Sequence, residues 1–378
     1  MLKEKLLGLL NLIPLQNTII FEASPDLADS PYYFFKYLVE TYHIQDDFKL
    51  VWFIQDNRNS RSTLLGAPIT CVNNLSSVRD LKTRIRRLYY NFTAKVIVDS
   101  NLYVYKKRPG QIRIFMDHGM PLKEAVEYQS GVGQCDLLTM SGDLFAKSYR
   151  KFTDPACFKV YGLPRDEPMY HLSREGVTEK TVLWMPTYRQ HRNHVAEGNQ
   201  PRNLFPMGIP VIKTEEELLQ VNDALRELDM KLMLRLHPAQ DTSVLKVSDM
   251  SNIVLADNQY LKEHGMMLED LLADSDALIT DYSSVYYDYL FTDRPIALTF
   301  EDVVEYQKTM PLIFDDIEKE LPGEQLLTTN DLIAFFREVK NGEDPYLQAR
   351  KDFMEASGIR PYPSCQLIAN YLMEKLGR

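Results

Sequence analysis

Five short motifs and one further aspartate carry groups that could bind or transfer a charged group. They are "DHGMPLK" (117–123), "YGLPRDE" (161–167), "PTYR" (186–189), "LHP" (236–238), "TDYSS" (280–284) and, one helical turn further, Asp288. Each follows an apolar run typical of a buried strand, and each alone arises often by chance. Because all six follow predicted strands in order along the chain, we expect them to surround one ligand.

His118 lies between Asp117 and Gly119, directly after an apolar run. An imidazole at the carboxyl end of a strand can take a proton from a hydroxyl, with Gly119 leaving room for a substrate and Pro121 beginning the next helix. We interpret His118 as a candidate base, the alternative being a histidine that only fills space. Asp117 is not expected to orient the ring, because adjacent side chains of an extended chain point apart.

His237 follows the strand predicted over 231–236 and precedes Pro238, which fixes the turn out of that strand. Its imidazole could donate to a phosphate oxygen and stabilise charge on a leaving nucleotide, a role that Arg189 could share. The alternative is a histidine that fills a loop.

The "TDYSS" motif predicts an anion site at the start of a helix. Ser283 or Ser284 caps that helix, and two hydroxyls with free backbone amides can hold a phosphate without a glycine-rich loop or a metal. Simple capping is the alternative. Asp288 lies one turn further on the same face, where it could accept a ribose hydroxyl, or be a solvated acid in the first turns of the helix.

Composition limits the class of protein. The chain has 378 residues, 45% of them hydrophobic and 25% charged, which suits two globular domains. Four cysteines without paired spacing indicate neither a zinc site nor a disulfide framework, and Asp, Glu and His show no metal-ligand spacing. Since no long apolar window occurs, we expect neither export nor a membrane span.

Charge is uneven along the chain. The net charge of −10 argues against a nucleic-acid partner, yet residues 1–115 carry 16 Lys and Arg against 10 Asp and Glu. Within this part, the cations and aromatic residues of "LKTRIRRLYYNF" (81–92) suit a helix that lies on an anionic membrane surface. A solvated helix that simply covers a sheet is the alternative.

Strands and helices are predicted to alternate in two series, which indicates an α/β fold with two doubly wound parallel sheets. The expected domains are 1–175, 176–345, and a pair of helices over 346–378 that pack back on the first domain. A long irregular segment over 189–210 is expected to be a functional or disordered loop. The first series has strands at 17–23, 49–54, 94–100, 111–116, 136–140 and 158–162, and the second at 181–186, 231–236, 252–256, 277–280 and 295–300.

The motif series resembles that of the CDP-glycerol glycerophosphotransferase family, the teichoic acid primases and polymerases. "DHGMPLK", "YGLPRDE", "MPTYR", "LRLHP" and "LITDYSSVYYDY" carry the resemblance, together with the Asp-Ser-Pro step of "FEASPDLADSPYYFF". The resemblance implies a GT-B-like fold of two Rossmann-like domains with the active site in the cleft between them. It also implies metal-independent transfer of an alcohol phosphate, with a CDP-alcohol as substrate and no cofactor.

Carried over by residue, the resemblance makes His118 the base on the acceptor hydroxyl and His237 the partner of the donor pyrophosphate. Donor-binding positions are then Arg189, Ser283, Ser284 and Asp288, and acceptor-side positions are Asp29, Gly119 and Lys123. The chain departs from the family pattern at Met120, Asp117 and Glu167, which concerns mainly the preference for an acceptor.

We therefore expect a cytoplasmic enzyme, peripheral at the inner face of the cell membrane. It would add glycerol phosphate, or a related polyol phosphate, to a lipid-linked teichoic acid or capsular polysaccharide acceptor. One alternative is a GT-B glycosyltransferase that uses a nucleotide sugar. Another is a non-catalytic binding partner of a polymer synthase, against which the presence of both His118 and His237 argues.

Overall fold

The computed structural model describes residues 13–75, 80–101, 108–124, 135–149, 154–170, 172, 179–188, 205–237, 245 and 248–378. These residues form two compact units, each with its own sheet. Unit 1 takes its residues from 1–120, 125–167 and 358–378, and unit 2 from 121–124 and 168–357. These limits differ from the boundaries expected at 175 and 345, and they divide the C-terminal helices between the units.

Unit 1 is built on an eight-stranded sheet in the order β3-β4-β2-β1-β5-β6-β7-β8. Neighbouring strands are parallel except for the antiparallel pair β3–β4. All six strands predicted in this part are present, whereas β3 and β4, at the half-exposed edge, were not predicted. The strands are β1 (Gln16–Glu22), β2 (Lys49–Ile54), β3 (Thr63–Leu64), β4 (Ala67–Asn73), β5 (Ala94–Asp99), β6 (Ile112–Phe115), β7 (Leu137–Met140) and β8 (Phe158–Val160).

Four α-helices belong to the described part of unit 1: α2 (Asp29–Tyr42), α3 (Leu81–Thr93), α4 (Ala146–Tyr149) and α14 (Ser364–Leu376). The first of them, α2, ends where His43 adopts φ 46° and its N–H donates to the carbonyl of Leu38. The last, α14, packs against α2. Its first turn is held by Glu167, whose Oε1 accepts from the backbone N–H of Cys365 at 2.6 Å.

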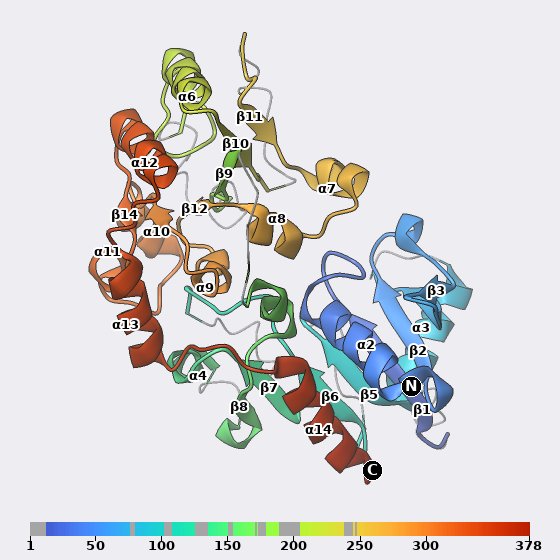
Figure 1. The fold of residues 1–378 in the computed structure, drawn as a ribbon. Coiled ribbons are helices and arrows are strands. Elements are labelled where there is room, and N and C mark those ends of the chain that lie inside the picture. Colours follow the sequence, from blue (N-terminus) through green and yellow to red (C-terminus); the bar gives the residue numbers. More distant parts are fainter. Residues whose placement is uncertain are drawn as a thin grey trace. The chain divides into compact units, whose positions relative to one another are not determined.

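Unit 2 has a six-stranded parallel sheet in the order β11-β10-β9-β12-β13-β14. Figure 1 shows α6 and α12 beside each other over this sheet, and both begin with a capping box, Thr214 with Glu217 and Thr328 with Asp331. The strands are β9 (Lys180–Trp184), β10 (Met230–Leu234), β11 (Ile253–Leu255), β12 (Ala277–Thr280), β13 (Ile296–Leu298) and β14 (Glu324–Gln325). The helices are α6 (Glu215–Glu227), α7 (Asn258–His264), α8 (Leu268–Asp274), α9 (Val285–Leu290), α10 (Val303–Thr309), α11 (Ile317–Glu320), α12 (Thr329–Asn341) and α13 (Leu347–Ser357).

The expected helix start at Pro121 is wrong. Lys123 instead forms an antiparallel bridge with Leu312. The backbone N–H of Glu124 donates to Pro311 at 2.8 Å, and the N–H of Ile313 donates to Leu122 at 3.0 Å. Strand-like pairing within unit 2 therefore takes up the backbone groups that a helix would have used.

The apolar strands predicted from sequence form the cores. In unit 1, Trp52 is fully buried and stacks on Phe21 with ring centroids 5.2 Å apart, and in unit 2 Trp184 is equally buried. Among the described helices, none is long and apolar enough to cross a bilayer.

Polar groups are buried where the central strands of unit 1 end. Arg113 makes two bonds to Asp99, at 2.9 and 2.7 Å, and both side chains are fully buried. Glu22 lies beside Asp99 in the strand register and is 1% exposed. Burial, reinforced by the charge of Asp99, raises the pKa of Glu22 well above its ordinary value.

The protonated state of Glu22 makes the stability of the protein depend on pH. In the unfolded chain this carboxyl loses its proton at about pH 4.3. The raised pKa keeps the proton on the folded protein to higher pH. The folded state therefore binds more protons in this window, and stability falls as the pH rises from about 4.3 through the folded pKa. Glu22→Gln, which mimics the neutral acid, should flatten this fall in urea unfolding at a series of pH values.

Glu40→Gln, at an exposed position of α2, is the matched control for removing one carboxylate from unit 1. An unchanged slope of stability against pH in Glu22→Gln would contradict the prediction.

Candidate active site

The carboxyl edge of the unit 1 sheet brings three loops together around His118. Its backbone carbonyl accepts from Arg165 Nη1 at 2.8 Å, and its Nδ1 lies 3.3 Å from the carbonyl oxygen of Ser100. Arg165, in turn, lies 3.3 Å from Asp29 Oδ1. His118 and Asp29, both predicted as site residues, are thus joined by Arg165, with Gly119 next to His118 in the chain.

Asp117 contacts the ring of His118, contrary to expectation. Its Oδ1 lies 2.8 Å from His118 Nδ1 and accepts from the His118 backbone N–H at 2.7 Å. The prediction assumed an extended chain, but Asp117 adopts φ 54°, in the left-handed region. This conformation folds the carboxylate back onto the following residue, as Asp side chains can do.

The surroundings of His118 set its charge. Burial would lower the pKa of its imidazole, but the adjacent carboxylate of Asp117 opposes this and, with Asp29, raises the pKa to about 9. The charge of Arg165 acts in the lowering direction. The side chain is nevertheless 60% exposed, so part of the ring can meet a ligand.

Arg165 is a site residue that sequence reasoning missed. It lies in a 3-10 helix over Pro164–Met169, and its side chain is 8% exposed. Its motif, "YGLPRDE", had been recognised, but the arginine had not been assigned a role. Its position at a strand's carboxyl end was the signal that could have found it.

The carboxyl edge of unit 2 is held by a buried carboxylate. Both oxygens of Asp281 accept from the Thr187 backbone N–H, at 2.9 and 3.0 Å, and Oδ1 also accepts from Thr187 Oγ1 at 2.5 Å. Asp281 is completely buried. It follows β12, and Thr187 follows the neighbouring β9, so one side chain joins the "TDYSS" and "PTYR" motifs.

The two serines of "TDYSS" are half-buried and do little capping. Ser284, the N-cap of α9, makes no side-chain capping bond, and Ser283 Oγ accepts from Val285 N only at 3.4 Å. Helix α9 has six residues, so its dipole is weak and a ligand would rely on hydroxyls and local amides. Asp288 is 3% exposed, so its interpretation as a solvated acid is wrong.

His237 follows β10, which pairs with β9 in the sheet. Its exposed ring stacks on Tyr188 with centroids 4.7 Å apart and planes at 16°. Tyr188 was not singled out from the sequence. Arg189 and residues 190–204 of the predicted irregular loop lie outside the described residues.

Lys123, predicted as an acceptor-side residue, belongs to unit 2. Its Nζ lies 5.7 Å from the ring centroid of Tyr306. That ring stacks at 3.9 Å on Tyr282 of "TDYSS", whose hydroxyl donates to Asp302 Oδ1 at 2.9 Å. The ammonium group of Lys123 is therefore placed near the motif predicted to bind the donor.

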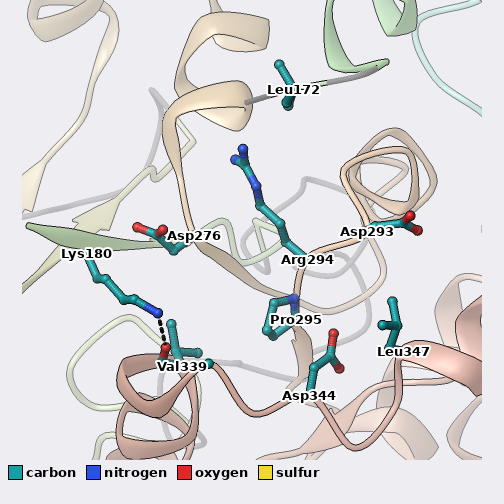
Figure 2. A pocket seen from close by; sticks show the side chains of 10 residues that line it. Leu172, Lys180, Asp276, Asp293, Arg294, Pro295, Val339, Asp344 and Leu347 are labelled. Atoms are coloured by element: carbon teal, nitrogen blue, oxygen red, sulfur yellow. Dashed lines mark hydrogen bonds between the residues drawn. The ribbon is translucent and has the colours of Figure 1, made fainter. Parts of the chain in front are cut away.

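A cavity of about 360 Å³ lies at the opposite, amino-terminal edge of the unit 2 sheet. In Figure 2 the side chain of Lys180 lies beside Val339, whose carbonyl oxygen accepts a hydrogen bond from Lys180 Nζ at 2.6 Å. Arg294 donates to the carbonyls of Ala273 and Ser275, and Asp276 accepts from Thr181 N. Because the protein itself uses these charged groups, we do not interpret the cavity as the functional site.

Within the part of the chain that the structure describes, no group of three or more His, Cys, Asp or Glu could hold a metal ion. The expectation of metal-independent chemistry stays a prediction.

Comparison with known proteins identifies the family. The model of the family described as CDP-Glycerol:Poly(glycerophosphate) glycerophosphotransferase matches residues 10–357. The chain belongs to this family. It is therefore a family enzyme, as the motif series indicated.

Several relatives of the chain carry names from teichoic acid synthesis. The teichoic acid glycerol-phosphate primase of Bacillus subtilis (strain 168) is 25% identical over 281 residues, 66% of each chain. The teichoic acid glycerol-phosphate transferase of Staphylococcus aureus (strain NCTC 8325 / PS 47) is 24% identical over 377 residues, which cover 92% of this chain and 90% of the relative.

Solved structures confirm the fold class. The wall teichoic acid polymerase TagF superposes with a TM-score of 0.73 at 19% identity, covering 99% of this chain and 94% of that chain. A putative UDP-N-acetylglucosamine 2-epimerase from Listeria monocytogenes gives a TM-score of 0.54 at 11% identity, covering 96% and 97%. The chain thus has two Rossmann-like domains and a GT-B-like fold.

The bond between the two motifs of unit 2 should matter for stability. Asp281→Ala leaves the Thr187 N–H without its acceptor, and we expect a loss of about 2–4 kcal/mol of unfolding free energy. Thr187→Val removes the hydroxyl bond to the same carboxylate but keeps the backbone N–H, and should cost about 1.5–3 kcal/mol. Denaturant unfolding of both variants tests this. Equal stability of Asp281→Ala and the unchanged protein would show that the carboxylate does not hold the motifs together.

Proposed function

We propose that this protein transfers glycerol phosphate, or a related polyol phosphate, from a CDP-alcohol to a hydroxyl of a lipid-linked teichoic acid or capsular polysaccharide acceptor. The observation that carries the proposal is His118, held through Nδ1 by Asp117 while most of its side chain is exposed. A histidine held in this way suits proton transfer. Family membership and relatives named as glycerol-phosphate primase and transferase support the choice of substrates.

In the proposed reaction, Nε2 of His118 takes the proton of the acceptor hydroxyl as its oxygen attacks the β-phosphorus of the donor. The new phosphorus–oxygen bond forms while the bond from that phosphorus to the bridging oxygen breaks, and cytidine monophosphate leaves. Four groups stabilise the negative charge that develops on the leaving cytidine monophosphate. They are His237, the hydroxyls of Ser283 and Ser284, and the ammonium group of Lys123. We assign the donor to unit 2 and the acceptor to unit 1, with Asp288 and Arg189 on the donor side.

A lipid-linked acceptor would lie at a membrane surface, and helix α3 has the features of a helix that binds such a surface. Leu81, Ile85 and Tyr89 recur every four residues and are 67%, 55% and 38% exposed. At 100° per residue they form one stripe, with the exposed Lys82 and Arg86 on one side and Arg84 on the other. We propose that this stripe rests on anionic lipid, which places the enzyme at the inner face of the membrane.

Product analysis tests the proposed function. Purified protein would be incubated with short lipid-linked acceptors and with CDP-glycerol, CDP-ribitol or a set of UDP-sugars. The products would be analysed by mass spectrometry. We expect growth of the acceptor by one or more polyol phosphate units with release of cytidine monophosphate. Transfer of a sugar would establish the glycosyltransferase alternative, and absence of any transfer or donor hydrolysis would favour a non-catalytic partner.

Donor affinity distinguishes a phosphate site from a helix cap at Ser283 and Ser284. Glycine caps a helix nearly as well as serine but has no hydroxyl. Ser283→Gly/Ser284→Gly should therefore keep most of the stability while CDP-glycerol binds about 10-fold or more weakly, because a bond to a charged group is worth about 1.5–3 kcal/mol. Calorimetric titration measures the affinity, and wild-type affinity would mean that the hydroxyls do not bind the donor.

Chelation tests the proposed absence of a metal. Because protein cations and hydroxyls are assigned to the leaving group, we expect full transfer in EDTA. Loss of transfer on chelation, restored by Mg²⁺ or Mn²⁺, would refute this assignment.

Vesicle flotation tests the α3 surface. Leu81→Gln/Ile85→Gln should weaken binding to phosphatidylglycerol vesicles at least about 10-fold, because burying one such side chain is worth about 1.5–3 kcal/mol. The control is Val304→Gln/Leu327→Gln, which changes apolar residues that are 67% and 55% exposed elsewhere. Equal binding by both double variants, or no preference for anionic over zwitterionic vesicles, would exclude α3 as the membrane contact.

A further inference from the structure

The ring of His118 has two chemically distinct nitrogens, and its neighbours engage only one of them. Asp117 Oδ1 lies 2.8 Å from Nδ1, and the carbonyl oxygen of Ser100 lies 3.3 Å from the same atom. Both neighbours are hydrogen-bond acceptors, so Nδ1 carries the hydrogen. Nε2 has no hydrogen-bond partner among the described residues, and in the neutral ring it holds the free lone pair.

Asp117 itself is fixed from several directions. Its side chain is 6% exposed, and its Oδ1 accepts from the His118 backbone N–H at 2.7 Å. The left-handed backbone, φ 54°, directs the carboxylate toward the residue that follows. An aspartate with an ordinary extended backbone could not reach the ring of its neighbour in this way.

We propose that Asp117 is the positioning residue of His118, holding the imidazole in the Nδ1–H tautomer so that Nε2 takes the proton of the acceptor hydroxyl. The inference rests on the proposed function and deepens it. The carboxylate also stabilises the imidazolium that forms when the proton arrives, as the buried aspartate of a Ser-His-Asp triad does.

Three charged groups face the ring, and they predict how it titrates. Asp117 and Asp29 favour the protonated ring, whereas Arg165 and burial oppose it, and the resulting pKa is about 9. A base works only when deprotonated, so kcat/KM should rise with pH along a limb near pH 9. Removing the charge of Asp117 should move this limb toward lower pH.

Nitrogen NMR of histidine-labelled protein tests the pairing without any substrate, because nitrogen shifts distinguish the two tautomers. In the unchanged protein we expect the His118 signal, assigned by its loss in His118→Gln, to titrate near pH 9 and to show Nδ1–H in the neutral ring. A neutral ring protonated on Nε2 would overturn the proposal.

Two variants extend the test, and both tolerate a left-handed backbone. In Asp117→Asn, which keeps the shape, the pKa of His118 should fall. In Asp117→Gly, which removes the side chain, the neutral ring should become a mixture of tautomers. Glu40→Gln, which removes an exposed carboxylate of α2, is the control and should leave both unchanged. An unaltered His118 titration and tautomer in the folded variants would overturn the proposal.

Kinetics then connect the pair to the reaction. In Asp117→Asn, kcat measured above the pH limb, where His118 is deprotonated in both proteins, should fall at least about 10-fold with KM for the donor unchanged. The limb itself should shift with the NMR pKa. An unshifted limb together with a shifted NMR pKa would show that Asp117 does not act through His118 in catalysis. If the NMR results hold but no CDP-alcohol is transferred, the pairing stands and the proposed function fails.

Discussion

Parallel pairing of strands places all their carboxyl ends at one edge of a sheet, and the chemistry of both units depends on this constraint. In unit 1 it brings Asp117 and His118, after β6, to the carbonyl of Ser100, after β5. In unit 2 it brings Asp281, after β12, to Thr187, after β9. Residues far apart in sequence thus become neighbours without long connecting loops.

Buried carboxylates maintain these edges at some energetic expense. Asp281 is satisfied by Thr187 and Asp99 by Arg113, whereas burial raises the pKa of Glu22 and so favours its neutral form. Asp29 and Asp117 both have positive φ angles, and each accepts from the backbone N–H of the residue that follows. Strained backbone that is compensated by local hydrogen bonds is typical of sites where a side chain must point in one direction.

Most of the fold could be predicted from the sequence, since continuous apolar runs such as those of β2 and β12 are readable as buried parallel strands. Edges and local backbone conformations could not. Strand β4 is only half-buried and lacks such a run. The helix expected to start at Pro121 does not form there, because Lys123 pairs instead with Leu312, which lies far along the chain and could not be anticipated from the sequence. His118 could be singled out by its place after a strand, but its contact with Asp117 depends on a φ angle that no spacing rule predicts. The hydrogen bond by which Glu167 holds the start of α14 could not be predicted from the sequence either, because its donor is Cys365, from the far end of the chain.

We propose that His118 acts on the acceptor while unit 2 binds the donor. The most direct measurement compares His118→Ala with the unchanged protein in two assays, calorimetric binding of CDP-glycerol and the rate of polyol phosphate transfer. We predict unchanged donor affinity and a kcat lower by about 10²- to 10⁴-fold, the usual contribution of general base catalysis. Near-normal transfer by a folded His118→Ala protein would contradict the account.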